Sequence, residues 1–230
     1  MHSLTPLEPN PALVAYLEKP LIKSIAFNGF KYSYSVNGHT LYTGGIHSKI
    51  KSIYYPDFEI KLRQYRRKGK GNKKKGSTKK QGILIDKELA AYVKSGKKKK
   101  PRNMLSKAVV SYIEDHCKSS IQAAQVPVFI KQFGVVTQAD LIIRTPKGEL
   151  MMLELKSGYN SARAQGTIHG VPDVANTIKN HWELQRHFTK KGLIEGGLPI
   201  KGSYIINVYQ EDKGVTVKKR KNPEWVKQIK

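Results

Sequence analysis

Residues 126–156, VPVFIKQFGVVTQADLIIRTPKGELMMLELK, decide the fold. They hold three apolar runs of strand length, at 126–133, 139–144 and 149–156. The tripeptide PKG at 146–148 separates the last two runs. It predicts a tight turn, because proline fixes the first φ angle and glycine tolerates a left-handed one. We therefore expect consecutive strands here, the last two of them antiparallel.

The position of this turn predicts the register of the two strands. Asp140 and Glu154 each lie seven residues from Lys147, so antiparallel pairing places them opposite each other on one face. Lys156 comes two residues after Glu154 and shares that face, because side chains alternate along a strand. The leucines between these charged residues point the other way, into a core. Two carboxylates and one ammonium group are thus expected to converge.

Such a group predicts metal-assisted chemistry. Charges in a core strand need partners or a metal ion, and carboxylate oxygens favour Mg²⁺ or Mn²⁺. A bound divalent ion would polarise a phosphoryl oxygen and acidify a bound water. Lys156 would orient that water or stabilise the charge that develops on the phosphate. The alternative is that Glu154 and Lys156 belong to a solvated strand face.

The segments around these strands complete an α/β pattern. Apolar residues at three- and four-residue spacing predict helices at 82–95 and 103–118, and we expect a long helix at 173–190. A strand is expected at 202–210, with 214–219 as its candidate partner. The expected order is helix, helix, three strands, helix, strand.

The first eighty residues are expected to form a separate region, 1–80, before a core at 81–230. Residues 1–30 contain four prolines and read as an irregular arm with at most one short helix. The Asn37-Gly38 dipeptide predicts a β-hairpin over 31–44, and 58–66 is a candidate short basic helix. The stretch 66–80 is rich in lysine and glycine and cannot bury enough apolar surface to fold alone, so it predicts a flexible loop.

The charge of the chain points to its partner. Lysine and arginine outnumber aspartate and glutamate by 42 to 17, which gives a formal net charge of +25. Such a charge attracts polyanions, with DNA, duplex or single-stranded, as the first candidate. A membrane surface would need an amphipathic apolar face or a lipidation signal, and neither is seen. The sequence shows no signal peptide and no apolar run of spanning length.

Lysine runs are the candidate phosphate contacts. Lys73, Lys74 and Lys75 lie in the basic loop, and Lys97 and Lys98 begin a second run. Solvated loops are the alternative, but solubility does not require so many charges of one sign, so phosphate contact is the better interpretation.

Two further features bear on binding and location. Ser157 and Arg163 follow the strand of Glu154, in a segment that is either a loop contacting the scissile strand or a plain surface loop. The KKRK stretch at 218–221 fits either DNA binding or a nuclear-localisation patch.

Cys117 is the only cysteine, which excludes an internal disulfide and a multi-cysteine zinc site. We expect an intracellular protein of the nucleus, the nucleoid or another DNA-containing compartment.

Several short motifs, taken in order, resemble the PD-(D/E)XK nuclease superfamily, in particular its RecB-like and lambda-exonuclease-like branch. They are GILID at 82–86, QVPVFI at 125–130, QADLI at 138–142, LELKSG at 153–158 and HWELQRHF at 181–188. The resemblance covers roughly residues 80–210. It implies a restriction-endonuclease-like core, a mixed central sheet flanked by helices, here with an N-terminal β-hairpin extension.

The resemblance also implies roles for individual residues. Asp140, Glu154 and the backbone carbonyl of Leu155 would be metal ligands, and Gln185 would match the family's helical glutamine. Asp86 stands where many members have a histidine. A helical acid beside the site is also typical, and Glu114, Glu88 and Asp86 compete for that role.

The expected function is therefore a Mg²⁺- or Mn²⁺-dependent deoxyribonuclease, an exonuclease or an end- or structure-processing enzyme of DNA repair, recombination or replication. Asp140, Glu154, Lys156 and Gln185 would be its catalytic residues. The alternative is a non-catalytic nucleic-acid-binding protein on a nuclease-like fold. A ribosome-associated or packaging protein would explain the charge alone, but not the paired strands.

Overall fold

A mixed five-stranded sheet forms the centre of the protein. The computed structural model describes residues 10–27, 31–58, 60, 79–157, 163–211 and 214–229. The strand order is β10-β9-β6-β5-β4. All neighbours pair antiparallel except β6 and β9, which are parallel. The strands are β4 (Ser120–Ile130), β5 (Val135–Arg144), β6 (Leu150–Ser157), β9 (Ile200–Glu211) and β10 (Gly214–Lys219).

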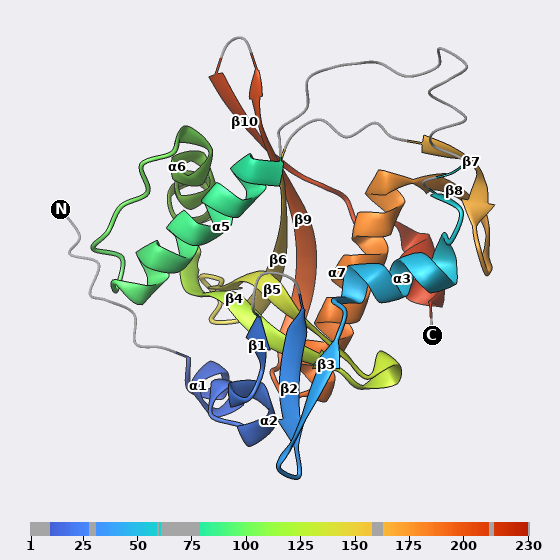
Figure 1. Ribbon diagram of the computed structural model, residues 1–230. Coiled ribbons are helices and arrows are strands. Elements are labelled where there is room, and N and C mark those ends of the chain that lie inside the picture. Colours follow the sequence, from blue (N-terminus) through green and yellow to red (C-terminus); the bar gives the residue numbers. More distant parts are fainter. Residues whose placement is uncertain are drawn as a thin grey trace.

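Helices cover both faces of this sheet, which confirms the predicted mixed α/β class. On one face lie α5 (Lys79–Lys94) and α6 (Met104–Ser111). On the other lies α7 (Ile178–Glu195), with α3 (Ile46–Tyr54) packed against it (Figure 1). The helix–helix–three-strand order of the core and the pairing of β10 with β9 are as predicted.

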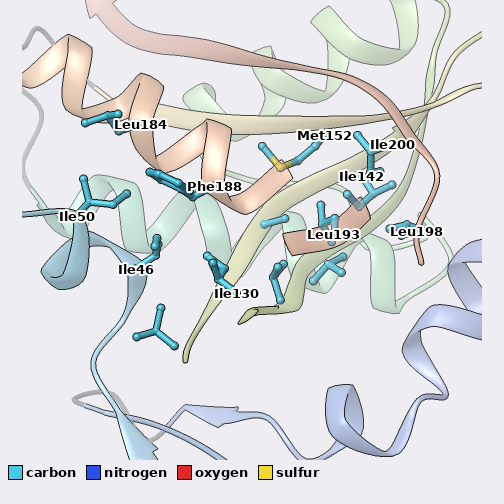
Figure 2. Packing of buried hydrophobic residues seen from close by; sticks show 14 of the residues in the cluster. Ile46, Ile50, Ile130, Ile142, Met152, Leu184, Phe188, Leu193, Leu198 and Ile200 are labelled. Atoms are coloured by element: carbon cyan, nitrogen blue, oxygen red, sulfur yellow. The ribbon is translucent and has the colours of Figure 1, made fainter. Parts of the chain in front are cut away.

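Each face of the sheet has its own hydrophobic cluster. Leu184 and Phe188 of α7 pack with Ile142 and Met152 of the sheet (Figure 2). The cluster under α5 and α6 joins residues such as Leu89 and Val109 to the opposite face. Ile142 and Met152 face this cluster, and their neighbours along β5 and β6 face the other one. This alternation fixes the register of the two strands, because a shift by one residue would turn every side chain to the wrong face.

The N-terminal arm is more regular than predicted. It contains two helices, α1 (Pro11–Leu17) and α2 (Pro20–Lys23), where at most one was expected. The prolines do not break these helices, because Pro11 and Pro20 occupy the first helical position, where no N–H is needed. The side chain of Asn10 caps α1.

A small three-stranded sheet follows the arm. It is formed by β1 (Ala26–Phe27), β2 (Tyr32–Val36) and β3 (His39–Thr43), all antiparallel. Asn37 and Gly38, both with positive φ, connect β2 to β3. Leu13 and Ile46 belong to the same hydrophobic cluster as the central sheet. The division of the chain at residue 80 stays a prediction.

Several predicted boundaries are wrong. The helix predicted at 103–118 corresponds to α6, which ends at Ser111 and is followed by a π-helical turn, Tyr112–His116. β4 begins at Ser120, not Val126, and ends at Ile130, before a 3₁₀ turn at Lys131–Phe133. Its first half, SIQAAQ, has Ile121 as its one strong strand former and joins the sheet by pairing with β5, with an irregularity between Ile121 and Ala123.

The segment after β6 also differs from the prediction. Arg163 was expected in a loop, but β7 (Arg163–Ile168) pairs with β8 (Val171–Thr177). The helix expected from residue 173 therefore begins only at Ile178. Thr177 explains this start, because its side chain accepts the Asn180 N–H as an N-cap.

The remaining predictions concern the basic segments. The predicted helix at 58–66 and loop at 66–80 lie largely outside the described residues, but Lys79 and Lys80 belong to α5, not to a loop. A last 3₁₀ turn spans Glu224–Gln228. None of the described helices is long and apolar enough to cross a membrane.

Candidate active site

The β5–β6 turn has the predicted register. Arg144 pairs with Leu150 and Leu141 with Leu153, so the hairpin is centred on Lys147. Gly148 has a φ of 81°, which is the left-handed conformation expected of it.

At Asp140 the backbone pairing between β5 and β6 ends, and a side-chain hydrogen bond connects the two strands instead. Beyond the Leu141–Leu153 pair, the Asp140 carboxylate accepts the backbone N–H of Leu155 at 2.7 Å. β6 continues beside β9 as far as Ser157. Asp140 therefore lies where β6 is no longer paired with β5, next to Glu154 as the register predicts.

Glu154 is buried, and Lys156 and Gln185 lie beside it. Its side chain is 1% exposed, and its Oε1 atom lies 2.6 Å from the Lys156 ammonium. The same ammonium donates to Oε1 of Gln185 on α7 at 3.1 Å. Oε2 of Glu154 is buried and has no hydrogen-bond partner among the described residues. A buried carboxylate oxygen without a donor is costly, so this atom is suited to a cation or a water.

These side chains line one small pocket of about 150 Å³. It lies where α5, β5, β6 and α7 meet at the end of β6. The lining residues are Gly82, Ile85, Asp86, Asp140, Glu154, Leu155, Lys156, Ser157, Gln185 and Val208. Five elements, α5, β5, β6, α7 and β9, thus contribute to one cavity.

Burial, and then mutual repulsion, raises the pKa of the acids Asp86 and Asp140 in the pocket. Burial, followed by the charge of Glu154, raises the pKa of Asp86 from 3.8 to about 6. Burial and the same charge raise the pKa of Asp140 well above its usual range, against the opposing effects of Lys156 and the Leu155 N–H. Three carboxylates face one ammonium group, so the pocket favours added positive charge.

Lys156 is held in its charged form. Burial lowers its pKa, but the neighbouring charges of Glu154 and Asp140 outweigh this, so the pKa is raised above the ordinary lysine value. The pocket therefore presents a fixed positive group beside carboxylate oxygens.

The donor set fits a hard divalent cation in part. Asp140, Glu154 and Asp86 supply oxygen atoms, as Mg²⁺ and Mn²⁺ prefer. In the part of the chain that the structure describes, no three histidine, cysteine or acidic side chains are already gathered as a ligand cluster. A cation would have two close carboxylates here, Asp140 and Glu154, and would complete its shell with water, as Mg²⁺ usually does.

The structure separates the three competing helical acids. Asp86 lines the pocket. Glu114 is not brought to it, because its oxygens accept from Tyr92 at 2.7 Å and from Lys97 at 2.5 Å. Glu88 instead accepts the backbone N–H of Asn103. Asp86 is the one of these three that is placed to act in the pocket.

The predicted nucleic-acid contacts are dispersed. Ser157 lines the pocket and Lys98 is exposed. Lys97 is engaged by Glu114 and Ser120 instead of being directed at a ligand. The backbone of Arg163 belongs to β7, and its side chain lies outside the described residues. Lys73, Lys74 and Lys75 also lie outside the described residues.

The sequence does not predict the involvement of Tyr32, whose hydroxyl group interacts electrostatically with the acids of the pocket. Burial raises the pKa of Tyr32 on β2, and so do the charges of Asp140, Glu154 and Asp86. Its ring packs close to Gly45, where an added Cβ would lie 3.1 Å from Cε2. No local pattern marks Tyr32, because only tertiary folding brings the small sheet to β5.

The comparisons with known proteins leave the family open. A scan against protein-family models finds no match, and a search of curated proteins finds no similar sequence. The likeness to the PD-(D/E)XK superfamily therefore rests on the motifs in this chain.

Proposed function

We propose that this protein is a divalent-metal-dependent nuclease that hydrolyses DNA phosphodiester bonds, with a PD-(D/E)XK-like site on a restriction-endonuclease-like core. The observation that carries the proposal is the shared pocket of Asp140, Glu154 and Lys156, in which one buried Glu154 oxygen has no partner among the described residues. A strand face that is merely solvated would not bury these charges together.

The side chains of the pocket have separate roles in this proposal. Asp140 and Glu154, with Asp86 as the outer acid, would hold Mg²⁺ or Mn²⁺, and the Leu155 N–H orients the Asp140 carboxylate. When bound, the ion supplies Lewis-acid polarisation of a phosphoryl oxygen and a more acidic water.

Lys156 and Gln185 act beside the cation. The Lys156 ammonium stabilises charge on the phosphate or orients the attacking water, and Gln185 fixes the ammonium by accepting from it. A preformed positive group needs little reorganisation when charge develops in the transition state.

DNA is the proposed substrate because of the net charge of +25. We extend the proposal to the processing of DNA ends or branched structures, in a compartment that contains DNA. A non-catalytic DNA-binding protein is the second candidate. The Lys156–Glu154 ion pair favours it, since this pair gives Glu154 a partner without a metal.

One experiment separates the two candidates. Linear, circular and single-stranded DNA are incubated with the protein in Mg²⁺, Mn²⁺ or EDTA. Asp140→Asn removes a pocket charge, and Asp115→Asn, at an exposed acid of the π-helical turn, is the matched control. The nuclease proposal expects metal-dependent cleavage that only Asp140→Asn abolishes. DNA binding without cleavage in either metal would favour the second candidate.

A further inference from the structure

The outward face of α5 carries three lysines in a line. Lys80, Lys87 and Lys94 are exposed and follow one another at intervals of seven residues. Seven residues are close to two helical turns, so these side chains share one side of the helix at separations of about 10 Å along its axis. We call these three residues the lysine stripe.

No acid of α5 neutralises the lysine stripe. The helix has two acidic residues, and both are turned elsewhere. Asp86 lines the pocket, and Glu88 accepts the backbone N–H of Asn103 at 3.0 Å. The outward side of α5 is therefore positive along its whole length, which suits an extended polyanion.

The lysine stripe begins beside the candidate active site. Gly82, Ile85 and Asp86 line the pocket, and Lys80 and Lys87 flank these residues in the sequence. α5 passes close to β6 at Gly82, where an added Cβ would lie 3.3 Å from the Ser157 hydroxyl oxygen. At 3.6 residues per turn, Lys80 and Lys87 lie on the other side of α5 from Gly82 and Asp86, so a polymer with one phosphate in the pocket reaches them across the width of one helix, about 10 Å.

Two exposed apolar side chains lie between the lysines. Ile83 is 45% exposed and Leu84 is 41% exposed. Apolar side chains next to phosphate-binding lysines can contact sugars and base faces. An anionic membrane would need a wide free apolar face, but the apolar side of α5, including Leu89 and Tyr92, is already buried in the core. The face therefore fits DNA better than a membrane.

We propose that the lysine stripe binds the phosphate backbone of DNA as it leads to the carboxylate pocket. This rests on the proposed function, since it takes the pocket to be where a phosphodiester is placed. The stripe spans about 21 Å of helix axis. A duplex carries one phosphate per strand about every 3.4 Å, so three separate contacts fit within this length.

The test compares two triple variants that remove the same charge. Lys80→Gln, Lys87→Gln and Lys94→Gln together remove the stripe, and glutamine keeps a similar helix propensity. The control combines Lys118→Gln, Lys147→Gln and Lys201→Gln. These exposed lysines lie at the opposite end of the sheet from the pocket, near the Arg144–Leu150 pair.

Duplex affinity is measured in EDTA at four salt concentrations. Each lost contact should make the slope of log K against log[salt] shallower by about 0.9. For the stripe variant, the slope of log K against log[salt] should thus become shallower by about two to three. At 0.1 M salt this variant should bind duplex DNA roughly two orders of magnitude more weakly than the parent protein. The control variant should keep the slope of the parent protein. Circular dichroism checks that both are folded.

Three results decide the outcome. Equal slopes for the two variants would overturn the proposal. So would stripe-dependent binding to phosphatidylserine vesicles that is tighter than binding to DNA. A stripe-dependent salt slope in a protein that cuts no DNA in Mg²⁺ or Mn²⁺ would support the stripe and count against the nuclease, because binding in EDTA is measured independently of cleavage.

Discussion

Asp86→Asn should stabilise the folded protein at neutral pH. The pKa of Asp86 is raised from 3.8 to about 6, by burial first and then by the charge of Glu154. The folded state therefore resists ionisation of this carboxyl group more than the unfolded state does. A difference of this size corresponds to at most about 3 kcal/mol, and the open pocket reduces it to about 1–3 kcal/mol.

The sign of this effect depends on pH. Below pH 3.8 the carboxyl group is protonated in both states, so it imposes no penalty on folding. The penalty grows between 3.8 and about 6 and is complete above that range. The gain from Asp86→Asn should follow the same course, being small near pH 4 and full at pH 7.

Urea denaturation in EDTA between pH 4 and pH 8 measures this gain. Asp115→Asn, an exposed acid outside the pocket, is the control and should change little. Mg²⁺ should raise the stability of the parent protein more than that of the Asp86→Asn variant, since a cation relieves the same repulsion. A gain that does not vary with pH, or a loss of stability at pH 7, would refute the reasoning.

Three other perturbations test neighbouring parts of the structure. Lys156→Ala should abolish most cleavage but leave Mg²⁺ binding intact by calorimetry, because an ammonium group is not a ligand; near-parental turnover would remove it from the mechanism. Gly192→Ala should cost about 1–3 kcal/mol in urea denaturation, because its Cβ would lie 2.8 Å from Val128 Cγ1; an unchanged midpoint would contradict this packing. Burial, with a smaller effect of His47, lowers the pKa of His181 to about 3, so stability should be full above about pH 6.5 and fall by up to about 1.4 kcal/mol per pH unit below it. His181→Gln should flatten that decline, and an equally steep decline in the variant would show that other groups cause it.

The sequence predicts the centre of the site because that part is local. The contact between Asp140 and the β6 backbone follows from a short turn and a period of two, both visible within 126–156. Gln185 was expected on a helix, and its contact with Lys156 depends on how α7 packs across the sheet. Such a contact has no signature in either segment alone.

Long-range packing explains what the sequence could not resolve. Asp86, Glu88 and Glu114 all lie on helical segments, and only the folded arrangement directs Asp86 to the pocket and Glu114 to Lys97. The start of β4 was missed because its alanines, which have little strand propensity, become extended through pairing with β5. Tyr32 was missed because the small sheet reaches the site only in three dimensions.

The central claim is that the carboxylates serve a metal and that the lysines serve DNA. The most direct measurement compares Asp140→Asn and Glu154→Gln with the parent protein, by single-turnover cleavage in Mg²⁺ and by DNA affinity in EDTA. Both variants should lose cleavage and keep the parental affinity. Equal loss of affinity and cleavage in folded variants, or cleavage that persists without these carboxylates, would contradict the account.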